Sequence, residues 1–436
     1  MKTLDSIPTH KMERVGKLVS TGIKVGGNYL KYYGKNLIQG QHDRESLDEA
    51  NAKDIYDGLK TLKGSALKVA QMLSMEKNLL PKAYVEQFGL AQFSVPPLSG
   101  PLVTKLIKKY LGASPEALFD TFATQSINAA SIGQVHQATK NGKKLAVKIQ
   151  YPGVANSIGS DLAIVKPIAE RMFNIKGKAT EKYFKEVENK LLEETDYTIE
   201  LESSRYFAAQ CSHIPNLRFP TYYPEWSNEK ILTMDWMQGM HLSEYCSQPQ
   251  NLPKDNNQIG QTLWDFYMFQ MHTLKKVQAD PHPGNFLVSP KNELIALDFG
   301  CIKSIPEDFY KPYFELSKPE NIEEPAKFES LLYTLEILKP EDAPQEKQFF
   351  TSLFKDMMLL FTQPFHHENF DFGDESFWNA ITELSKTLSE NPQLRKLDGS
   401  RGSQHFIYVN RTFFGLYHLL HDLKAVVKTN NYVTFY

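Results

Sequence analysis

The sequence has little cysteine and no long uninterrupted hydrophobic run. Its three cysteines, Cys211, Cys246 and Cys301, are widely spaced and odd in number, which fits a reducing cytosol and argues against a disulfide scaffold or a zinc site. The most apolar C-terminal stretch, residues 406–420, is interrupted by an asparagine, an arginine and a histidine, so it is too short and too polar to span a bilayer. The basic start of the chain lacks the apolar core of a secretory signal. These absences predict a soluble, cytoplasmic protein without a transmembrane helix.

The chain also lacks an excess of charge of either sign. Lysine and arginine number 49, aspartate and glutamate 51, and the formal net charge is -2. This balance gives no overall attraction to nucleic acid or to acidic substrates. The hydrophobic share of 41% is ordinary for a globular protein. At 436 residues the chain is long enough for a two-lobed enzyme with buried cores.

Residues 11–35 depart from this balance. Six basic residues accompany one acid, Glu13, among aliphatic and aromatic side chains. One interpretation is a helix lying on the anionic inner face of a membrane. The other is a helix packed on its own protein, which the glycines of the segment favour because each weakens an isolated helix by about 1 kcal/mol. The basic residues are Lys11, Arg14, Lys17, Lys24, Lys31 and Lys35.

The segment from Leu47 to Ser74 has the apolar period of an amphipathic helix. Apolar residues recur at steps of three and four with no proline between them. Lys68 and Gln71 are three residues apart and lie together on another side of this helix, where composition alone favours a solvated edge. The apolar stripe comprises Ile55, Leu59, Leu62, Ala66, Val69 and Leu73.

Residues 129–149 predict a strand, a turn and a second strand. The stretch 129–136 leads into the turn dipeptide Asn141-Gly142, and an apolar run from Leu145 to Ile149 follows with Lys148 as its single charge. A hairpin with one lysine is typical of a phosphate-binding element. Aligned on Val135, a kinase glycine loop would have glycines at positions 128, 130 and 133, where this chain has Asn128, Ala130 and Gly133. Side chains at such positions keep backbone amides farther from phosphates.

Three polar residues near the middle of the chain have the spacing of a kinase-like metal site. Asp280, Asn285 and Asp298 are separated by five and thirteen residues, within Asp280-Pro-His-Pro-Gly-Asn285 and Asp298-Phe-Gly300. Magnesium bound to a nucleotide triphosphate prefers carboxylate and amide oxygens as ligands. We expect Asp298 and Asn285 to hold the metal ions and Asp280 to orient the attacking group or accept its proton. These groups and the amine of Lys148 are expected to act on one nucleotide.

Two further segments complete the candidate nucleotide-binding half. The acidic stretch 193–201 is predicted to be helical, with Glu193, Asp196, Tyr197 and Glu200 on one face. Carboxylates this close require a cation nearby, and Lys148 and Lys68 are the candidates. The run from Lys230 to Gly239 predicts a buried strand that ends in a hinge, where Met234, Asp235 and Met237 could contact an adenine edge.

Four motifs, in this order, resemble the UbiB (AarF/UbiB) family of atypical kinase-like proteins, which support ubiquinone biosynthesis and related isoprenoid-lipid chemistry. The similarity covers roughly Leu47 to Pro306. The motifs are Lys68-Val69-Ala70-Gln71, similar to the family's Lys-x-Gly-Gln; Ala129 to His136, similar to its alanine-rich loop; Glu194-Thr195-Asp196, similar to its Glu-x-Asp; and Asp280 to Asn285 with Asp298-Phe299-Gly300.

The resemblance implies an α+β, bilobal protein-kinase-like fold with a helical N-terminal extension and a mostly helical C-terminal lobe. It implies ATP and Mg²⁺ as cofactors, ATPase activity or phosphotransfer to an unidentified acceptor, and a membrane, isoprenoid-lipid or quinone-precursor partner. Lys148 would pair with Glu200. The regulatory motifs would comprise Lys68, Gln71, Glu194 and Asp196, with Lys68 reaching Glu194, and the nucleotide-binding loop would comprise Ala129, Ala130 and Ser131.

The chain departs from the family pattern at a few positions. Ala70 replaces the glycine of Lys-x-Gly-Gln, Asn128 replaces the first alanine of the loop, and Ser126 stands where proline is preferred. Gln278 stands two residues before Asp280, where the family usually has histidine. The metal and phosphate ligand positions are all present, so we expect nucleotide binding to persist.

The residues after Asp298 argue against an ordinary protein kinase. A helix is predicted to open at Pro306, so barely a half-dozen residues remain for an activation segment, and no Ala-Pro-Glu follows. The alternatives are a noncatalytic, nucleotide-gated lipid chaperone or scaffold, and a small-molecule phosphotransferase. The second of these gives no reason for Lys68 and Gln71 to face an acidic helix.

The pattern of the C-terminal residues completes a predicted organisation in four parts. Beyond Pro306 the pattern is mostly helical, with core faces at residues 309–316, 349–361 and 413–420 and loops at 362–377 and 391–403. The parts are a basic segment (1–46), a helical extension (47–126), a kinase-like N-terminal lobe with a helical insertion (127–237) and a kinase-like C-terminal lobe (238–436).

Overall fold

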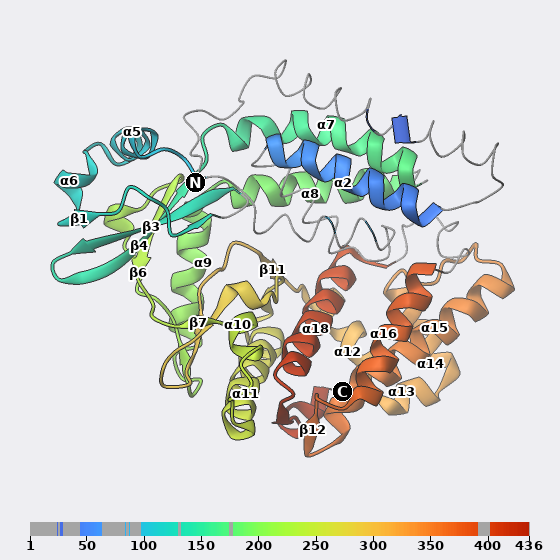
Figure 1. Cartoon of the computed structure of the whole chain (residues 1–436). Coiled ribbons are helices and arrows are strands. Elements are labelled where there is room, and N and C mark those ends of the chain that lie inside the picture. The colour runs from blue at the N-terminus through green and yellow to red at the C-terminus, as the bar shows by residue number, and fades with distance from the viewer. Residues whose placement is uncertain are drawn as a thin grey trace. The chain divides into compact units, whose positions relative to one another are not determined.

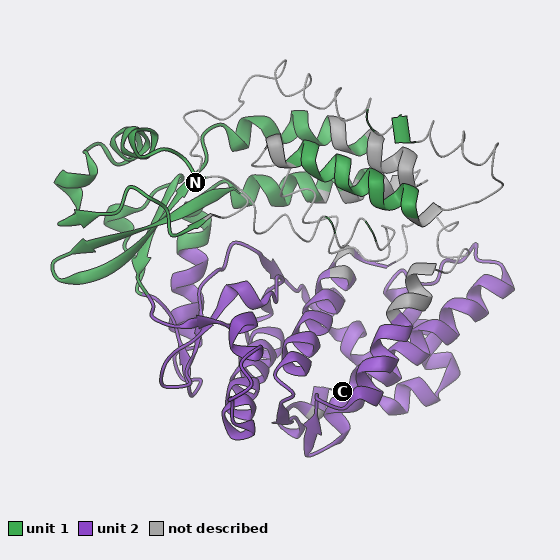
Figure 2. Ribbon diagram, viewed as in Figure 1, with its two compact units in different colours: residues 1–201, 221–236, 388–399 green, residues 202–220, 237–387, 400–436 purple. Residues whose placement is uncertain are grey.

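The chain divides into two compact units in the computed structural model (Figure 2). Unit 1 comprises residues 1–201, 221–236 and 388–399, and unit 2 comprises residues 202–220, 237–387 and 400–436. The structure describes residues 24, 27, 28, 44–62, 83, 87, 97–129, 132–173, 178–390 and 402–435.

An antiparallel sheet forms the centre of unit 1 (Figure 1). Its strand order is β1 (Thr121–Phe122), β3 (Gly133–Lys140), β4 (Lys143–Gln150) and β6 (Ile231–Asp235), and β2 (Asn128–Ala129) also pairs with β3. Asn141 and Gly142 have φ angles of 51° and 76°, which suit a tight turn between β3 and β4 because glycine and asparagine tolerate this region. The predicted strand, turn and strand are therefore confirmed.

Helices pack on this sheet through one apolar core. The described helices of unit 1 are α2 (Arg44–Leu62), α5 (Gly100–Leu111), α6 (Pro115–Leu118), α7 (Val154–Phe173), α8 (Lys178–Glu194) and the first residues of α9 (Tyr197–Gln210), with the 3₁₀ turn η2 (Pro224–Trp226) before β6. Ile55 and Leu59 of α2 belong to the same buried cluster as Val147 of β4 and Leu191 of α8. Figure 1 shows α2 alongside α7 and α8.

The predicted helix over residues 47–74 agrees with α2 in its first half. Its apolar residues Ile55 and Leu59 are buried as expected. Residues 63–82, with Lys68 and Gln71, lie outside the described residues. Of the basic segment, Asn28 is described, and its amide nitrogen donates to Asn51 at 3.2 Å and to Asp54 at 2.8 Å, so this residue packs on α2.

Unit 2 combines small sheets with helices. One sheet has the order β5 (Leu217–Arg218), β10 (Leu294–Ala296), β9 (Phe286–Val288) and β7 (Met240–His241); the pair β5 and β10 is parallel and the other pairs are antiparallel. Two antiparallel pairs join β8 (Lys276–Gln278) to β11 (Ile302–Ser304) and β12 (Asn369–Asp371) to β13 (Val426–Lys428).

The helices of unit 2 surround an aromatic core. Trp264 is fully buried, and its ring centroid lies 5.0 Å from that of Phe365 and 5.8 Å from that of Phe372. The helical elements are α10 (Leu242–Cys246), α11 (Pro253–Phe269), the π-helical turn η3 (Gln270–Leu274), η4 (Pro283–Asn285), α12 (Glu307–Leu316), α13 (Pro319–Glu323), α14 (Pro325–Thr334), α15 (Pro344–Thr362), η5 (Gln363–His366), α16 (Glu375–Glu390), α18 (Gln404–Asp422) and η6 (Asn430–Phe435).

The predicted C-terminal core faces are confirmed, and one predicted loop is wrong. Buried apolar and aromatic residues line α12, α15 and α18. Residues 362–377 are not a loop throughout, because they contain η5, strand β12 and the start of α16. Strand β12 forms because Asn369 pairs with Lys428 of β13, a partner too distant in sequence to leave a local signal. Residues 391–401 lie outside the described residues.

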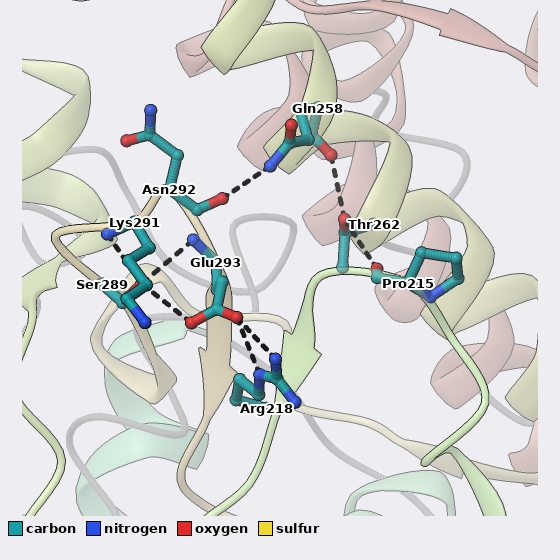
Figure 3. A network of polar contacts seen from close by, with 8 residues as sticks. All are labelled: Pro215, Arg218, Gln258, Thr262, Ser289, Lys291, Asn292 and Glu293. Carbon is teal, nitrogen blue, oxygen red and sulfur yellow. Dashed lines mark hydrogen bonds and ion pairs between the residues drawn. The ribbon is translucent and has the colours of Figure 1, made fainter.

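A polar network ties β5 and α11 to the turn between β9 and β10 (Figure 3). Arg218 donates through Nε and Nη2 to Oε1 of Glu293 at 2.9 and 2.7 Å. The Ser289 hydroxyl accepts from the Glu293 amide at 3.1 Å, and Gln258 donates to the carbonyl of Asn292 at 2.9 Å. These bonds fix a surface turn.

Candidate active site

Lys148 and Glu200 form an ion pair within unit 1. The ammonium of Lys148 donates to both carboxylate oxygens of Glu200, at 2.8 and 2.9 Å, across a sequence separation of 52 residues. The two side chains are only 12% and 6% exposed, and the ammonium lies 4.9 Å from the centre of the Tyr197 ring. The pair that the family resemblance implied is therefore present.

A break between two helices places Glu200. Helix α8 ends at Glu194 and α9 begins at Tyr197. Asp196 lies just before α9, and its Oδ1 accepts from the amide and the hydroxyl of Thr198 at 3.0 and 2.6 Å. The prediction of one helix face shared by Glu193, Asp196, Tyr197 and Glu200 is wrong, because Asp196 caps a new helix, as aspartate favours.

Hydrogen bonds to β4 and to the turn before β6 fix this helix junction. The carbonyl of Thr195 accepts from Gln150 of β4 at 3.0 Å and from the Lys230 ammonium at 2.8 Å. The amide of Tyr197 donates to the carbonyl of Glu229 at 3.1 Å. Glu200 is thus carried on a helix end that is held by β4 and by the turn before β6.

Gly133 is the glycine of the kinase-like loop that the chain retains, and it stands at a close approach. A Cβ atom at this position would lie 2.7 Å from the Tyr197 hydroxyl oxygen and 2.7 Å from the carbonyl oxygen of Ile149. No side chain fits there without moving backbone atoms. Ala129 ends β2 and pairs with Gln134, while Ala130 and Ser131 lie outside the described residues.

Two polar residues of the alanine-rich motif make internal contacts. Gln134 accepts from the amide of Leu98 at 2.8 Å, and its amide nitrogen lies 2.8 Å from Nε2 of His136. Nδ1 of His136 lies 2.8 Å from the carbonyl oxygen of Ala123. Burial lowers the pKa of His136, so the neutral ring donates to that carbonyl and accepts from Gln134. Both residues therefore hold β3 to the segments around it.

Asp235, one of the residues predicted to contact the nucleotide, makes hydrogen bonds within the protein. The Asp235 carboxylate accepts from the Tyr223 hydroxyl at 2.7 Å and from the Thr221 amide at 3.1 Å, and the Asp235 amide donates to the Thr221 carbonyl at 2.9 Å. Met234 is buried and Met237 is partly exposed. These bonds fix the end of β6.

In unit 2, Asp280 and Asn285 are joined across a short turn. The side-chain nitrogen of Asn285 donates to the carbonyl of Asp280 at 2.9 Å and approaches its Oδ2 at 3.4 Å. Nδ1 of His282 accepts from the Gly284 amide at 3.0 Å. Because the nitrogen of the Asn285 amide makes these bonds, its oxygen is the atom available for a hard cation.

A buried network of hydrogen bonds between uncharged groups supports Asp298. Its Oδ1 accepts from the Gly300 amide at 2.8 Å, and its carbonyl accepts from the side-chain nitrogen of Gln278. Gln278 is fully buried, and its side-chain oxygen accepts from the Tyr267 hydroxyl at 2.9 Å. Its backbone amide donates to the side-chain oxygen of Gln270 at 2.9 Å. Gln278 therefore supplies a supporting contact from the position where the family usually has histidine.

Burial keeps Tyr267 in its neutral form. Desolvation, followed by the charges of Asp280 and Cys301, raises the pKa of Tyr267 well above its ordinary value. The phenol therefore stays protonated and can donate to Gln278. The support beneath Asp298 is made of uncharged groups.

Aromatic packing and a short strand fix the residues that follow Asp298. Phe299 is 1% exposed, and its ring lies 5.1 Å from that of Phe207 in α9. Strand β11 then pairs with β8, and α12 begins directly after Pro306. The predicted absence of a long segment between Asp298 and the next helix is confirmed.

A contact that the sequence did not indicate reaches Asp280 from α18. Nη2 of Arg411 donates to Oδ1 of Asp280 at 3.1 Å, across 131 residues. One turn further along α18, Gly415 lies against Pro281. An arginine in a helical core-face pattern has no local signal of its partner, so sequence reasoning missed it.

The donor set fits a magnesium ion that shares its coordination with phosphates. Asn285 and Asp298 offer hard oxygens, and magnesium commonly takes one or two protein ligands of this kind plus phosphates and water. Within the described ranges, no group of three or more histidine, cysteine, aspartate and glutamate side chains is arranged to hold a metal ion. Among the helices that the structure describes, none is both long and apolar enough to cross a bilayer.

These features are typical of a kinase-like protein: a sheet with a lysine–glutamate ion pair, and an aspartate, an asparagine and a second aspartate at positions 280, 285 and 298. Residues 90–319 match the model of the ABC1 atypical kinase-like domain, which spans more than half of the chain. The chain therefore belongs to the ABC1 family of atypical kinase-like proteins, and the predicted UbiB/AarF resemblance is confirmed.

Several known proteins resemble the chain. It is 28% identical over 386 residues to the atypical kinase COQ8, mitochondrial, of Saccharomyces cerevisiae, covering 86% of this chain and 76% of that protein. It is 31% identical over 262 residues to the chloroplastic protein ACTIVITY OF BC1 COMPLEX KINASE 8 of Arabidopsis thaliana, covering 58% of this chain and only 34% of that protein. A solved complex of Rv3197 with erythromycin, from Mycobacterium tuberculosis, has a TM-score of 0.62 at 22% identity, covering 89% of this chain and 96% of that one; this likeness shows the fold.

Proposed function

We propose that the chain is a UbiB-type atypical kinase or ATPase that binds Mg-ATP. The observation that carries the proposal is the buried pair of Lys148 with Glu200, two groups 2.8 Å apart. A lysine held by a glutamate is the arrangement that kinases use on the nucleotide phosphates. The retained metal-ligand positions Asn285 and Asp298 support the same assignment.

In this proposal, each named residue has one role toward the nucleotide. Lys148 neutralises phosphate oxygens, and Glu200 keeps its ammonium directed. Asn285 and Asp298 would hold magnesium, which supplies charge neutralisation on the phosphates when bound. Asp280 orients the attacking hydroxyl or water and accepts its proton. The hinge residues Met234, Asp235 and Met237 and the loop residues Ala129, Ala130 and Ser131 are proposed to line the nucleotide.

The regulatory part of the proposal concerns the two family motifs. Lys68 and Gln71 are proposed to act with Glu194, so that the helical extension controls access to the nucleotide. Asp196 supports this arrangement by capping α9, the helix that carries Glu200. The motif would then influence the lysine–glutamate pair through a helix end.

The substrate side follows from the family and is proposed on that basis. We infer a role in quinone or isoprenoid-lipid metabolism, with a phenolic quinone precursor or a membrane surface as partner. The short connection from Gly300 to α12 supports a small or lipid-borne acceptor, because a peptide platform needs a longer segment. The basic residues 11–35 would suit an anionic membrane surface.

Steady-state ATP hydrolysis tests this function. Hydrolysis should rise when anionic vesicles and a quinone-precursor-like phenol are added together, and Asp280→Asn should lower it by roughly 100-fold, the scale of general-base assistance, while ATP affinity stays unchanged. Peptide phosphorylation without any dependence on lipid would contradict the proposed acceptor class.

The same variant separates the enzyme from a nucleotide-gated scaffold or lipid chaperone. A scaffold needs ATP binding and no proton acceptor. Asp280→Asn would then retain both ATP binding and biological complementation. Loss of complementation with binding intact favours the enzyme. The observation that favours the scaffold or chaperone is that Asn128 and Ala130 stand where a kinase loop has glycines.

A further inference from the structure

One face of α18 contacts the loop that carries Asp280. Arg411 and Gly415 are four residues apart in this helix, so they lie on the same side. Arg411 binds the Asp280 carboxylate at 3.1 Å. A Cβ atom on Gly415 would lie 2.2 Å from Cγ of Pro281 and 3.1 Å from its carbonyl oxygen. The helix backbone and the loop are therefore in direct contact at a position where only glycine fits.

Helix α18 is itself held firmly in unit 2. Leu416 and Tyr417 are fully buried, and the Tyr417 hydroxyl donates to the carbonyl of Phe361 at 2.7 Å. The Tyr313 hydroxyl donates to the side chain of Asn410, the neighbour of Arg411, at 2.7 Å. Arg411 thus projects from a packed element rather than from a surface loop.

Each oxygen of the Asp280 carboxylate faces a nitrogen donor. Arg411 binds Oδ1, and Asn285 approaches Oδ2 at 3.4 Å. The Asp280 and Arg411 side chains are 21% and 22% exposed, so solvent still reaches the carboxylate. A group that orients an acceptor needs a fixed direction, because small displacements of a reacting group cost large factors in rate.

We propose that Arg411 is the positioning residue for Asp280 and that Gly415 allows α18 to approach closely enough to deliver it. This inference rests on the proposed function, in which Asp280 acts on the attacking group. Arg411 directs the carboxylate without touching the nucleotide. Its loss therefore lowers turnover and leaves ATP affinity unchanged.

A double-mutant cycle on ATP turnover tests the proposal. Arg411→Ala should lower turnover by about 10-fold to 100-fold, and Asp280→Asn should lower it further. The double variant should be no slower than Asp280→Asn alone, because a residue that acts through Asp280 has no effect once that carboxylate is gone. Guanidinium ion added to Arg411→Ala should restore part of the lost turnover.

Arg218→Ala is the matched control. Arg218 also pairs with a carboxylate of unit 2, Glu293, at 2.7 Å (Figure 3), on a turn that the proposed chemistry does not use. Its turnover should equal that of the unchanged chain, and guanidinium ion should not affect it. Arg411→Lys serves as a second variant that keeps the charge and should retain intermediate turnover.

Gly415→Ala tests the helix contact without removing a charge. It should lower turnover, and guanidinium ion should not restore it. Gly260→Ala is its control, because a Cβ there would lie 2.5 Å from Cβ of Ala425, a crowded contact of the same unit that does not involve the loop with Asp280. A melting curve on each variant separates lost folding from lost turnover.

The outcomes distinguish this inference from the proposed function. Turnover of Arg411→Ala equal to that of Arg218→Ala, or effects of Arg411→Ala and Asp280→Asn that simply multiply, would overturn the positioning role and leave the proposed function intact. An unchanged chain that binds no Mg-ATP or hydrolyses none would overturn the proposed function, and the inference with it.

Discussion

Unit 2 contains two Asp-Phe-Gly triplets, at 298–300 and 371–373, and they are alike in local structure. In both, Oδ1 of the aspartate accepts from the glycine amide at 2.8 Å. The rings of Phe299 and Phe372 are each 1% exposed. In this chain, both triplets therefore form a tight hydrogen-bonded turn with a buried ring.

The surroundings of the two triplets differ. The carbonyl of Asp298 is bound by buried Gln278. Asp371 is exposed at the end of β12, and a Cβ on Gly373 would lie 3.1 Å from Cβ of Lys424. The two triplets therefore share their local geometry and differ in what surrounds them: a buried glutamine contacts the first, and the aspartate of the second is exposed.

The largest expected effect comes from removing one charge in each triplet. Asp298→Asn should weaken magnesium-dependent ATP binding on the order of 100-fold, because a metal ligand contributes several kcal/mol. Asp371→Asn should change it by less than about 2-fold. Asparagine keeps an oxygen for the glycine amide in both, so only the charge differs. A magnesium titration of ATP affinity measures both, and equal effects would abolish the distinction between the triplets.

The second effect concerns the support beneath Asp298. Gln278→Leu removes the buried partner of Tyr267 and of the Asp298 carbonyl and should lower the free energy of unfolding by about 2 kcal/mol. Gln278→His should lose less, since imidazole can both donate and accept. Gln250→Leu, at an exposed glutamine, is the control. Urea unfolding measures all three, and a Gln278→Leu loss no larger than that of the control refutes the supporting role.

The smallest expected effect is a dependence of stability on pH. Burial lowers the pKa of His272, in the π-helical turn beside Gln278, to about 3. The unfolded chain then binds more protons at this residue, so its contribution to stability is complete above about pH 6.5 and declines toward about pH 3. At about pH 5.5 the loss is about 1.4 kcal/mol.

His272→Gln provides the test of this pH effect. The free energy of unfolding of the unchanged chain and of His272→Gln is measured between about pH 7.5 and about pH 5.5. The unchanged chain should lose more stability over this range, and the difference should equal the contribution of one buried histidine. Parallel declines would mean that His272 is not protected in the folded protein.

Local pattern predicted much of this molecule. The turn at Asn141-Gly142, the apolar stripe of α2 and the buried faces of α12, α15 and α18 follow from periods and turn residues. Asp196 could have been read as a helix cap from its residue type alone, which would have corrected the single acidic helix. The pair of Lys148 with Glu200 came from the family pattern.

Other features depend on partners that are distant in sequence. Strand β12 exists because β13 pairs with it, and Arg411 reaches Asp280 from a helix whose sequence looks like ordinary core. The supporting role of Gln278 depends on Tyr267 and Asp298 meeting around it. None of these partners leaves a trace in the local period of hydrophobicity.

Calorimetric titration of ATP into the purified chain, with magnesium and then with a chelator, tests the central claim most directly. The account predicts binding that is at least about 10-fold tighter with magnesium, and that Lys148→Met weakens in both conditions. A chain that shows no affinity for adenine nucleotide in either condition would contradict the account.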